Sequence, residues 1–479
     1  MRGYPSSVGY RFLTSVGLKT AMPCLDNYPV IPASEASAVR TRVIYWFKRD
    51  LRLTDNKAFY EACASSQEVV PVFIFVPEVL SAYGGTQERM GFLVDCVAAL
   101  SRDIAKKGGR LYCFYGNPTE VLSRLVRTYG SDTIVTNKAH SYTFAPLESD
   151  VARMCAESRV HYLCYDDNFL SPVQEIPYRK VFSAFFSKWQ EHLRLDTCPT
   201  PERIATPDLN EPDLARIKHQ IPHKRNTFWN PSSAHARVQS FDFAAYEDTR
   251  NRMDIDGTSK LSPYIRFGVL SLRQIYAAAS ASGAGDQFIR ELAWREFWYH
   301  IKANFPELKD LEFQEKRRNI PWRNNENEMQ SFFEAQTGYP IIDAAIRQLK
   351  QEGWMHNRAR LIVGSFLTKD LLVDWRIGER FFKEFLVDYD EVVNAGNWQW
   401  VASVGPDPRP LRVFNPVLQA RRFDPEARYI KTYIPELSRY PAHMLHDPLK
   451  YELDYFKPLV NHYERAASCK AAFSRKRIS

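Results

Sequence analysis

The sequence lacks the closely spaced cysteine pairs on which zinc fingers and iron–sulfur clusters are built. Its eight cysteines are scattered along the chain, and no two of them lie within four residues of each other. Scattered cysteines at apolar positions are typical of reduced, intracellular thiols. We therefore expect no metal site and a cytoplasmic protein, with an organelle or the nucleus left open as its compartment.

Long hydrophobic runs and a strongly biased composition are also missing. No stretch of about 18 consecutive apolar residues occurs, so the sequence predicts no membrane-spanning helix. Contents of 45% hydrophobic and 25% charged residues exclude wholesale disorder and collagen-like repeats. The net charge of +8 suits a polyanionic partner only modestly, because 56 acidic residues offset 64 basic ones.

A standard dinucleotide-binding fingerprint is absent as well. The first apolar run, 42–47, is followed by Lys48-Arg49-Asp50-Leu51-Arg52-Leu53 and not by a GxGxxG turn. Residues 41–165 nevertheless alternate strand and helix patterns, which predicts an α/β domain with a parallel, Rossmann-like sheet. Ligands of such sheets bind at the carboxyl ends of the strands. We expect strands at 42–47, 69–76, 110–115, 132–137 and 160–165, and helices at 56–65, 88–107 and 118–129.

Three further segments complete the predicted organisation. For residues 1–40 we favour a disordered extension over a weak organelle presequence, because Asp26 and Glu35 count against the latter. Residues 166–235 are rich in proline, have no long apolar period and predict a long linker across a surface. Residues 236–479 predict an all-α domain, with helices expected at 271–279, 286–304, 328–335, 340–352, 358–372 and 378–385.

Two segments of the helical domain have the chemistry of a ligand site. In Asp256-Gly257-Thr258-Ser259-Lys260-Leu261-Ser262-Pro263 the hydroxyls either cap the following helix or join its first amides in a phosphate cradle, and both interpretations stay open. Glu291, Trp294 and Arg295 are spaced i, i+3 and i+4, so they share one helix face. Such a face suits an aromatic ligand with a phosphate tail, and a surface ion pair beside an indole fits it equally.

A third constellation spans residues 353–361 and 388–400. Arg360 is the obvious partner for a part-buried carboxylate at Asp388 or Asp390. A structural salt bridge explains one such pair. It does not explain the amides and indoles that accompany it, namely Asn357, Asn394, Trp354, Trp398 and Trp400.

Together these segments resemble the photolyase/cryptochrome flavoprotein family over about residues 41–465, and within it most closely the cyclobutane pyrimidine dimer photolyases. The resemblance implies a Rossmann-like antenna domain at 41–165, a linker at 166–235 and an all-α FAD- and DNA-binding domain at 236–479. The motifs that carry it are GTSKLSPY, ELAWREF, TGYPIIDAAIRQL, GWMHNRARL, DYDEVVNAGNWQWVAS and RVFNP.

The resemblance also implies a set of site residues. Those implied to contact FAD are Tyr246, Thr258, Ser259, Lys260, Leu261, Ser262, Phe288, Glu291, Arg295, Trp354, Asn357, Arg360, Asp388, Asp390 and Asn394. Those implied to contact DNA near the lesion are Arg250, Trp294, Asn357, Arg358, Trp400, Arg412 and Gln419. Those implied to act in the chemistry are Glu291, Asn394 beside the flavin N5, and an electron-transfer chain of Trp398, Trp375 and Trp322.

The implied function is light-driven repair of cyclobutane pyrimidine dimers in UV-damaged DNA, by electron transfer from excited, reduced FAD. The alternative is a cryptochrome-type blue-light sensor, which the short basic tail and Asn394 count against. A second, antenna chromophore is implied, whether folate, deazaflavin or flavin, and we expect a monomer without a membrane partner. Lys260, Phe288, Leu361 and the loop 406–411 depart from the usual pattern and leave the subclass open.

Overall fold

Five short apolar segments form one parallel sheet. The structure, a computed structural model, describes residues 40–82, 87–406 and 411–474. The strand order is β3-β2-β1-β4-β5, and each pairing is parallel. Every predicted strand is found close to its expected bounds: β1 (Arg40–Phe47), β2 (Ser66–Phe75), β3 (Tyr112–Tyr115), β4 (Thr133–Asn137) and β5 (His161–Tyr165).

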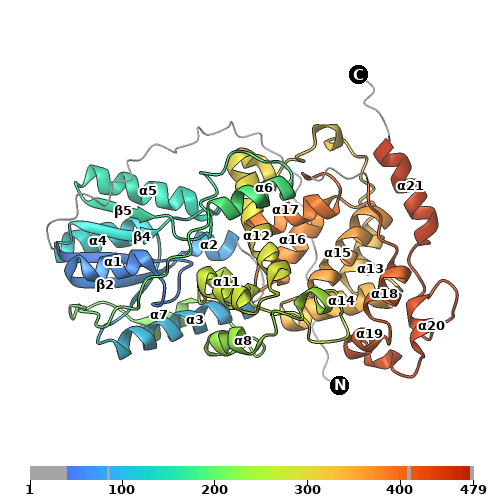
Figure 1. The fold of residues 1–479 in the computed structure, drawn as a ribbon, viewed down its shortest axis with the longest axis horizontal. Coiled ribbons are helices and arrows are strands. Elements are labelled where there is room, and N and C mark those ends of the chain that lie inside the picture. The colour runs from blue at the N-terminus through green and yellow to red at the C-terminus, as the bar shows by residue number, and fades with distance from the viewer. Residues whose placement is uncertain (1–39, 83–86, 407–410, 475–479) are drawn as a thin grey trace.

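Helices cover both faces of the sheet, because strand residues alternate between two apolar clusters. Val43, Tyr45 and Phe47 of β1 cluster with side chains of α1 and α3, whereas Ile44 and Trp46 cluster with those of α4 and α5. Burial on both faces explains why the strands are continuous apolar runs in the sequence. The helices of this region are α1 (Lys57–Ala64), α2 (Pro77–Ala82), α3 (Gln87–Lys106), α4 (Pro118–Tyr129) and α5 (Phe144–Glu157) (Figure 1).

The carboxyl ends of β1 and β4 meet where the strand order reverses, which is where a doubly wound sheet opens a crevice. Lys48 and Arg49 follow β1, and Lys138 and His140 follow β4. These four residues line a cavity of about 50 Å³ together with residues of the helical region, among them Arg273. We call this cavity the sheet-edge cleft.

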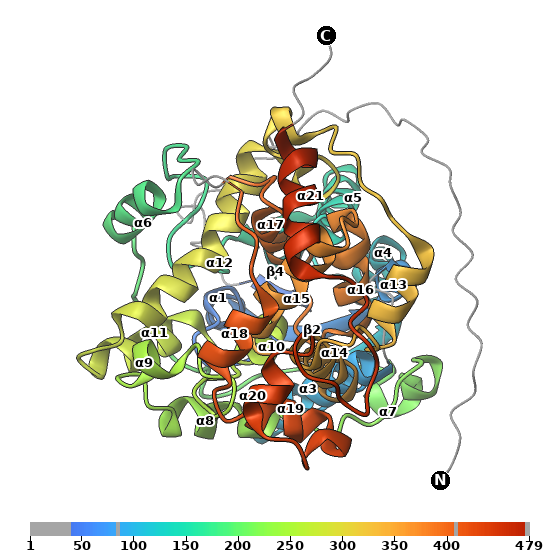
Figure 2. The ribbon, with the colours of Figure 1, turned by 90° about the vertical axis from the view of Figure 1, so that its right-hand side faces the viewer.

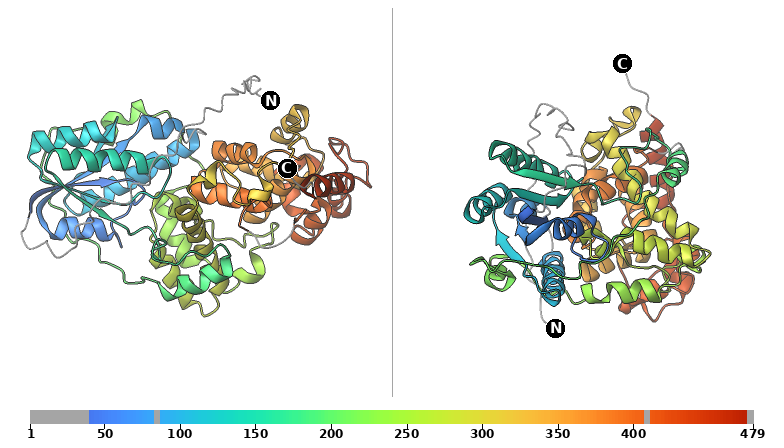
Figure 3. Two further views of the ribbon diagram at one scale, coloured as in Figure 1. Left: turned by 90° about the horizontal axis from the view of Figure 1, so that it is seen from above. Right: turned by 60° about the vertical axis from the view of Figure 1, so that its left-hand side comes forward.

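The rest of the chain is mainly helical, as predicted, and lies beside the α/β region (Figures 1 and 3). In the described ranges, no helix is both long and apolar enough to cross a membrane. The extension expected at 1–40 falls outside the described residues, apart from Arg40 at the start of β1. The elements are α8 (Ala234–Ser240), α9 (Tyr246–Thr249), α10 (Ser262–Phe267), α11 (Leu272–Ala281), α12 (Asp286–Asn304), η4 (Pro306–Lys309), η5 (Glu315–Arg317), α13 (Glu326–Phe333), α14 (Pro340–Glu352), α15 (Asn357–Ser365), η6 (Phe366–Asp370), α16 (Trp375–Phe385), α17 (Glu391–Val401), α18 (Pro416–Phe423), α19 (Arg428–Tyr433), η7 (Pro435–Leu437), α20 (Ala442–His446) and α21 (His462–Ser474).

The proline-rich segment 166–235 contains helical elements that the sequence did not predict. They are α6 (Phe182–Glu191), α7 (Leu214–Ile217), η2 (Lys218–Gln220) and η3 (Pro231–Ser233). The longest of them, α6, packs beside α12 (Figures 1 and 2). Its buried side chains are Phe182, Phe185 and Trp189, a helical spacing that the sequence analysis overlooked among the surrounding prolines.

Candidate functional site

A pocket of about 730 Å³ lies in the helical region, and we call it the helical pocket. Side chains from α9, α10, α12, α15, α16, α17 and α18 contribute to its lining. Eight basic and three acidic residues line it, so its charge is net positive, and five tryptophans supply flat apolar surface. This combination suits a ligand that carries both aromatic rings and phosphates.

The structure brings together in this lining every residue that the resemblance assigned to the cofactor or to DNA. These residues come from segments as far apart in the sequence as Tyr246 and Gln419. Glu291, Trp294 and Arg295, which were predicted to share one face of a helix, all lie on α12 and line the helical pocket. Trp398 also lines the pocket, whereas Trp375 and Trp322 are not among its lining residues.

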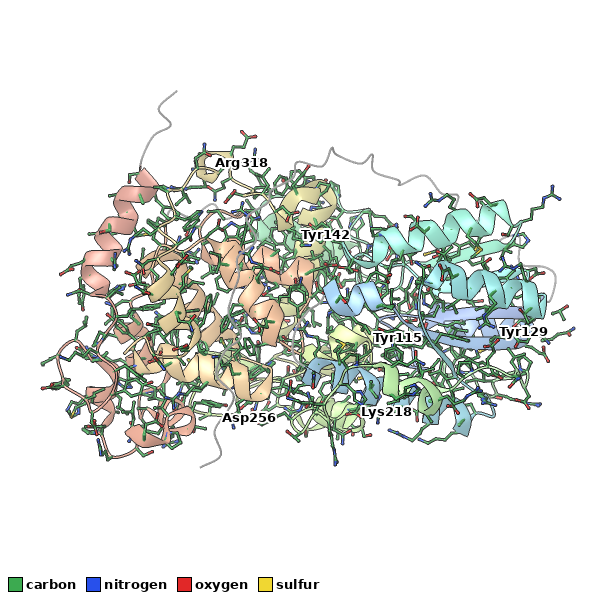
Figure 4. All side chains as sticks on the ribbon, turned by 180° about the vertical axis from the view of Figure 1, so that it is seen from behind. Tyr115, Tyr129, Tyr142, Lys218, Asp256 and Arg318 are labelled. Carbon is green, nitrogen blue, oxygen red and sulfur yellow. The ribbon has the colours of Figure 1, made fainter. Side chains whose placement is uncertain are left out.

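The segment 256–263 is tied to Asp388 rather than to the helix that follows it. Ser262 Oγ donates to Asp388 Oδ2 at 2.6 Å and accepts from Trp354 Nε1 at 3.2 Å. The N-cap residue of α10, Leu261, has no side-chain cap, although Ser259 Oγ accepts from Leu261 N at 3.4 Å just before the helix. Lys260 has a left-handed backbone with φ of 51° and pairs at 2.8 Å with Asp256, which lies at the edge of the helical region in Figure 4.

One oxygen of Asp388 has two partners, and the other has none among the described residues. Arg360 Nη2 donates to Asp388 Oδ2 at 2.7 Å, which is the pairing that the sequence predicted. Asp388 Oδ1 is buried and has no hydrogen-bond partner among the described residues. A buried acceptor without a donor is costly, so this oxygen is suited to a ligand that brings a hydroxyl or an N–H.

Asp390 links the helical pocket to the α/β region. Its carboxylate caps α17 by accepting from Val392 N, and it also accepts from Tyr299 Oη at 2.6 Å and from Arg49 Nη2 at 2.5 Å. Burial alone would raise the pKa of Asp390. The positive charges of Arg49, Arg266 and Arg295 outweigh it and hold the pKa well below its ordinary value. Asp390 is therefore ionised at neutral pH.

The boundary between the two regions contains further contacts of this kind. Thr143 donates to the Glu391 carboxylate through both its backbone nitrogen and its hydroxyl, each at 2.9 Å. The preceding residue, Tyr142, lies at this boundary in Figure 4, with Lys302 Nζ 4.7 Å from its ring centroid. The first turn of α17 is thus anchored by the α/β region.

Glu291 forms an ion pair on the pocket wall. Its carboxylate accepts from Arg250 Nη1 and, at 3.0 Å, from Gln287 Nε2. Trp294 and Trp400, both expected to contact DNA near the lesion, are half-buried, and Arg412 lies 4.7 Å from the Trp400 ring centroid. The wall therefore combines charge with flat apolar surface.

Asn394 is oriented by a carboxylate that the sequence analysis missed. Its Nδ2 donates to Glu379 Oε1 at 3.1 Å, and the same carboxylate oxygen accepts from Tyr389 Oη at 2.8 Å. Burial raises the pKa of Glu379. Because the amide nitrogen is engaged, the side-chain oxygen of Asn394 is the group left to accept a hydrogen bond in the pocket.

The three tryptophans of the expected electron-transfer chain share one apolar cluster. Trp398 is buried on the pocket wall, Trp375 is fully buried and Trp322 is half-buried, with Phe473 of α21 edge-on to it at 6.0 Å. A Cβ at Gly378 would collide with the Trp398 ring, so this glycine allows α16 to approach α17 closely.

Comparison with known proteins agrees with this architecture. Residues 43–205 match the family model described as DNA photolyase, and residues 288–475 match that described as FAD binding domain of DNA photolyase. A curated relative from Synechococcus, named deoxyribodipyrimidine photo-lyase, is 34% identical over 473 residues, which cover 90% of this chain and 96% of the relative. The chain belongs to the DNA photolyase family.

Two solved photolyase structures share the whole fold. A bacterial class III photolyase from Agrobacterium tumefaciens superposes with a TM-score of 0.84 at 31% identity and covers 93% of this chain and 99% of that one. An archaeal photolyase from Sulfolobus tokodaii, described with two FAD molecules, superposes with a TM-score of 0.83 at 30% identity and covers 90% and 99%. The α/β and helical regions of this photolyase therefore correspond to the family fold.

The helical pocket of this photolyase fits FAD on its own geometry. Trp354, Trp398 and Phe288 offer apolar surface to the rings, and eight basic residues offset the diphosphate charge. Asp388 Oδ1 offers a free acceptor to a hydroxyl.

Basic side chains that line the sheet-edge cleft of this photolyase form ion pairs with nearby carboxylates. Arg273 donates to Asp55 at 2.8 Å and to Asp167 at 2.7 Å, and Lys48 pairs with the Glu148 carboxylate. No group of three or more His, Cys, Asp or Glu residues in the described part of the chain is arranged to hold a metal ion.

Sequence reasoning missed several residues of the pocket of this photolyase. Arg266 lies only four residues after Ser262, and the GTSKLSPY motif could have drawn attention to it. Arg422 lies on the lining beside the predicted Gln419, within the basic run that follows Arg409. Arg49 and Glu379 reach Asp390 and Asn394 only through the fold, and no local signal indicates them.

Proposed function

We propose that this photolyase repairs cyclobutane pyrimidine dimers in DNA with the energy of blue light. The observation that carries the proposal is the composition of the helical pocket. One cavity combines a net positive charge, five tryptophans and the Arg250–Glu291 pair. It also contains Asp388 Oδ1, which has no hydrogen-bond donor among the described residues and can accept from a ligand. FAD, when bound and reduced, supplies the light-absorbing group that donates an electron to the dimer and takes it back after the ring splits.

The protein's own part is to bind, orient and shield the dimer. Trp294 and Trp400 present flat faces on which a flipped-out dimer can stack. Arg250, Arg358, Arg412 and Gln419 surround them and suit the DNA backbone near the lesion. Arg358 is held by Asn251, whose Oδ1 accepts from its Nη2 at 2.6 Å.

Glu291 and Arg250 act together on the dimer. Pyrimidine rings carry N–H donors and carbonyl acceptors, and the extra electron concentrates negative charge on the carbonyls. Glu291 offers hydrogen bonds to the rings, and Arg250 beside it offers positive charge to the carbonyls. Interactions that strengthen as the charge develops raise the yield of splitting.

The test of this function uses Glu291→Ala and Glu291→Gln. We expect Ala to lower dimer splitting per absorbed photon by about ten- to a hundredfold, and Gln to lower it less because it keeps a hydrogen-bonding group. The measurement is loss of thymine dimers from irradiated duplex DNA under blue light, with the flavin reduced beforehand. FAD content serves as the control. Parental protein that binds FAD but splits no dimer would overturn the proposal in favour of a sensor.

We also propose that Trp322, Trp375 and Trp398 carry an electron from a reductant in solution to the oxidised cofactor. Trp398→Phe keeps the packing but removes an easily oxidised ring, so we expect it to abolish photoreduction and to spare repair when the flavin is reduced chemically. Trp46→Phe, in the core of the sheet, is the matched control. Photoreduction of Trp398→Phe at the parental rate contradicts this route.

Two further features of this photolyase belong to the proposal. We place it inside the cell, supported by its scattered thiols, of which every described one is free. We also propose that it is a monomer, and light scattering would measure its mass. For a second, antenna chromophore we propose the carboxyl edge of the sheet. The cleft there measures about 50 Å³, so a fused-ring ligand requires its side chains to move. Absorption spectra before and after FAD extraction test this.

A further inference from the structure

The proline-rich segment 166–235, which connects the α/β and helical regions, places an aromatic ring directly behind one wall of the helical pocket. Phe182 of α6 stacks on Trp294 of α12 with their ring centroids 3.7 Å apart and their planes 3° apart. Trp294 lines the pocket, and its side chain is only half-buried. Phe182 covers one face of the indole, so a ligand in the pocket must use the other face or the edge.

The stack continues away from the pocket along α6. Phe182 and Phe186 are 5.7 Å apart at 23°, and Phe186 and Trp189 are 5.8 Å apart at 18°. Arg290 of α12 lies over this column, with its guanidinium 4.6 Å from the Phe186 ring centroid and 5.5 Å from that of Phe182. Four near-parallel rings therefore run from the buried interior to the pocket wall.

A buried carboxylate fixes the far end of this column. Trp189 Nε1 donates to Glu296 Oε2 at 2.7 Å, and the same carboxylate accepts from the backbone nitrogens of Leu170 and Ser171 at 2.6 Å and 3.1 Å. Glu296 is on α12, two residues after Trp294. The column on α6 is thus joined to α12 at both ends, once through Glu296 and once through the stacked pair.

We propose that Phe182 is a positioning residue that sets the plane of Trp294 for stacking on the flipped-out dimer. This inference rests on the proposed repair function. Phe297 meets Trp294 edge-on at 5.4 Å and Trp298 is tilted to it at 5.9 Å. Among these rings, therefore, Phe182 alone lies parallel to the indole. Because Phe182 contacts one face of Trp294, the indole is ordered when the chain folds. DNA binding then does not have to supply the free energy of ordering it.

The same helix provides a matched comparison. Phe185 is fully buried and packs against Phe297 at 5.3 Å and against His300 at 5.0 Å. A change at Phe185 removes a buried aromatic ring from α6 as a change at Phe182 does, but it leaves the ring behind Trp294 in place. The two positions therefore separate a general loss of packing from a loss of wall orientation.

The experiment compares Phe182→Leu, Phe182→Tyr and Phe185→Leu with the parent. The dissociation constant is measured for a duplex with one thymine dimer and for the undamaged duplex, alongside FAD content and unfolding temperature. We expect Phe182→Leu to weaken binding of the dimer duplex by about fivefold, the size of an aromatic stacking contribution. Affinity for undamaged DNA and FAD content should not change. Phe182→Tyr, which keeps the flat ring, should restore binding, and Phe185→Leu should lower the unfolding temperature without a dimer-selective loss.

A second measurement keeps the inference testable if Phe182→Leu is poorly stable. In a Trp294→Ala background no wall is left to orient, so adding Phe182→Leu should not weaken dimer binding further. Additive losses in the two backgrounds, an equal dimer-selective loss in Phe185→Leu, or parental binding by Phe182→Leu would each overturn the role of Phe182. A parent that does not prefer dimer-containing DNA would instead overturn the proposed repair function, and with it the inference.

Discussion

The sheet-edge cleft and the helical pocket are lined by the same kinds of side chain, yet these side chains have different roles at the two sites. Arg273 and Lys48 in the cleft are engaged by carboxylates of the α/β region, and the space that remains is about 50 Å³. In the pocket, Arg360 shares Asp388 with Ser262, the other Asp388 oxygen has no partner in the described part of the chain, and about 730 Å³ stays open. The comparison teaches that basic side chains held in ion pairs around little free space stabilise the fold, whereas basic side chains around a large open cavity form a ligand site.

The difference matters because an intact buried ion pair adds little net stability, whereas removing one of its two charges destabilises the fold strongly. Replacing one partner leaves the other charge buried and alone, which costs about 3–5 kcal/mol. A pocket cation that faces a ligand has less effect on folding and more on binding. Changes at the cleft should therefore lower stability, and changes at the pocket should lower affinity.

Asp390 lines the helical pocket and pairs with Arg49, which lines the sheet-edge cleft, so its loss should have the largest effect. Asp390→Ala removes a carboxylate that pairs with Arg49, and breaking a buried ion pair costs about 3–5 kcal/mol of unfolding free energy. It also removes the cap of α17, which costs about 1 kcal/mol more. The free energy of unfolding, measured with denaturant, and the retention of FAD should both fall. Asp390→Asn is the matched control, because it keeps the cap and loses the charge.

The same residue gives this comparison a pH dependence. The pKa of Asp390 is held below its ordinary value by Arg49, Arg266 and Arg295 against the effect of burial, so the folded state favours the ionised form. Its stabilisation is present above the unfolded pKa of about 4 and is lost as the pH falls through the folded pKa. Asp390→Asn should therefore lose less stability than the parent on acidification, and equal acid sensitivity would contradict this.

Arg273→Met and Arg360→Met sharpen the comparison directly. Arg273 is buried between Asp55 and Asp167, so its loss should lower the unfolding free energy by about 3 kcal/mol and leave FAD affinity unchanged. Arg360 lies on the pocket wall, so its loss should lower FAD affinity by about tenfold or more, with a smaller change in stability. FAD titration and urea unfolding of both variants check this, and two identical profiles would break the distinction.

The smallest expected effect concerns an exposed cation at the rim of the pocket. Arg422 is exposed and lines the helical pocket. If it contacts a DNA phosphate, Arg422→Ala should reduce the slope of log affinity against log salt by about one and leave FAD binding and stability unchanged. Salt titrations on damaged duplex measure the slope. Arg216→Ala, in α7 of the connecting segment, is the control, and an equal slope change there would contradict a specific contact.

The sequence by itself determined the fold class and the identity of most pocket residues. The apolar runs within 42–47 and 132–137 predict strands of a parallel sheet, because strands covered on both faces bury most of their side chains. The motifs around Ser262, Glu291 and Asp388 supplied residues that all lie on one cavity. Their individual roles, and the domain boundaries at 165 and 235, stay predictions.

Only the tertiary structure decided how those residues are held. Arg49 and Asp390 are 341 residues apart and meet because the sheet ends where α17 begins. Phe182 lies in a segment whose prolines predicted a passive linker, and it reaches Trp294 only because α6 packs on α12. The physical reason is general: periodicity and motifs report on neighbours within one element, whereas charge pairing and ring stacking between elements depend on distances that only the folded chain sets.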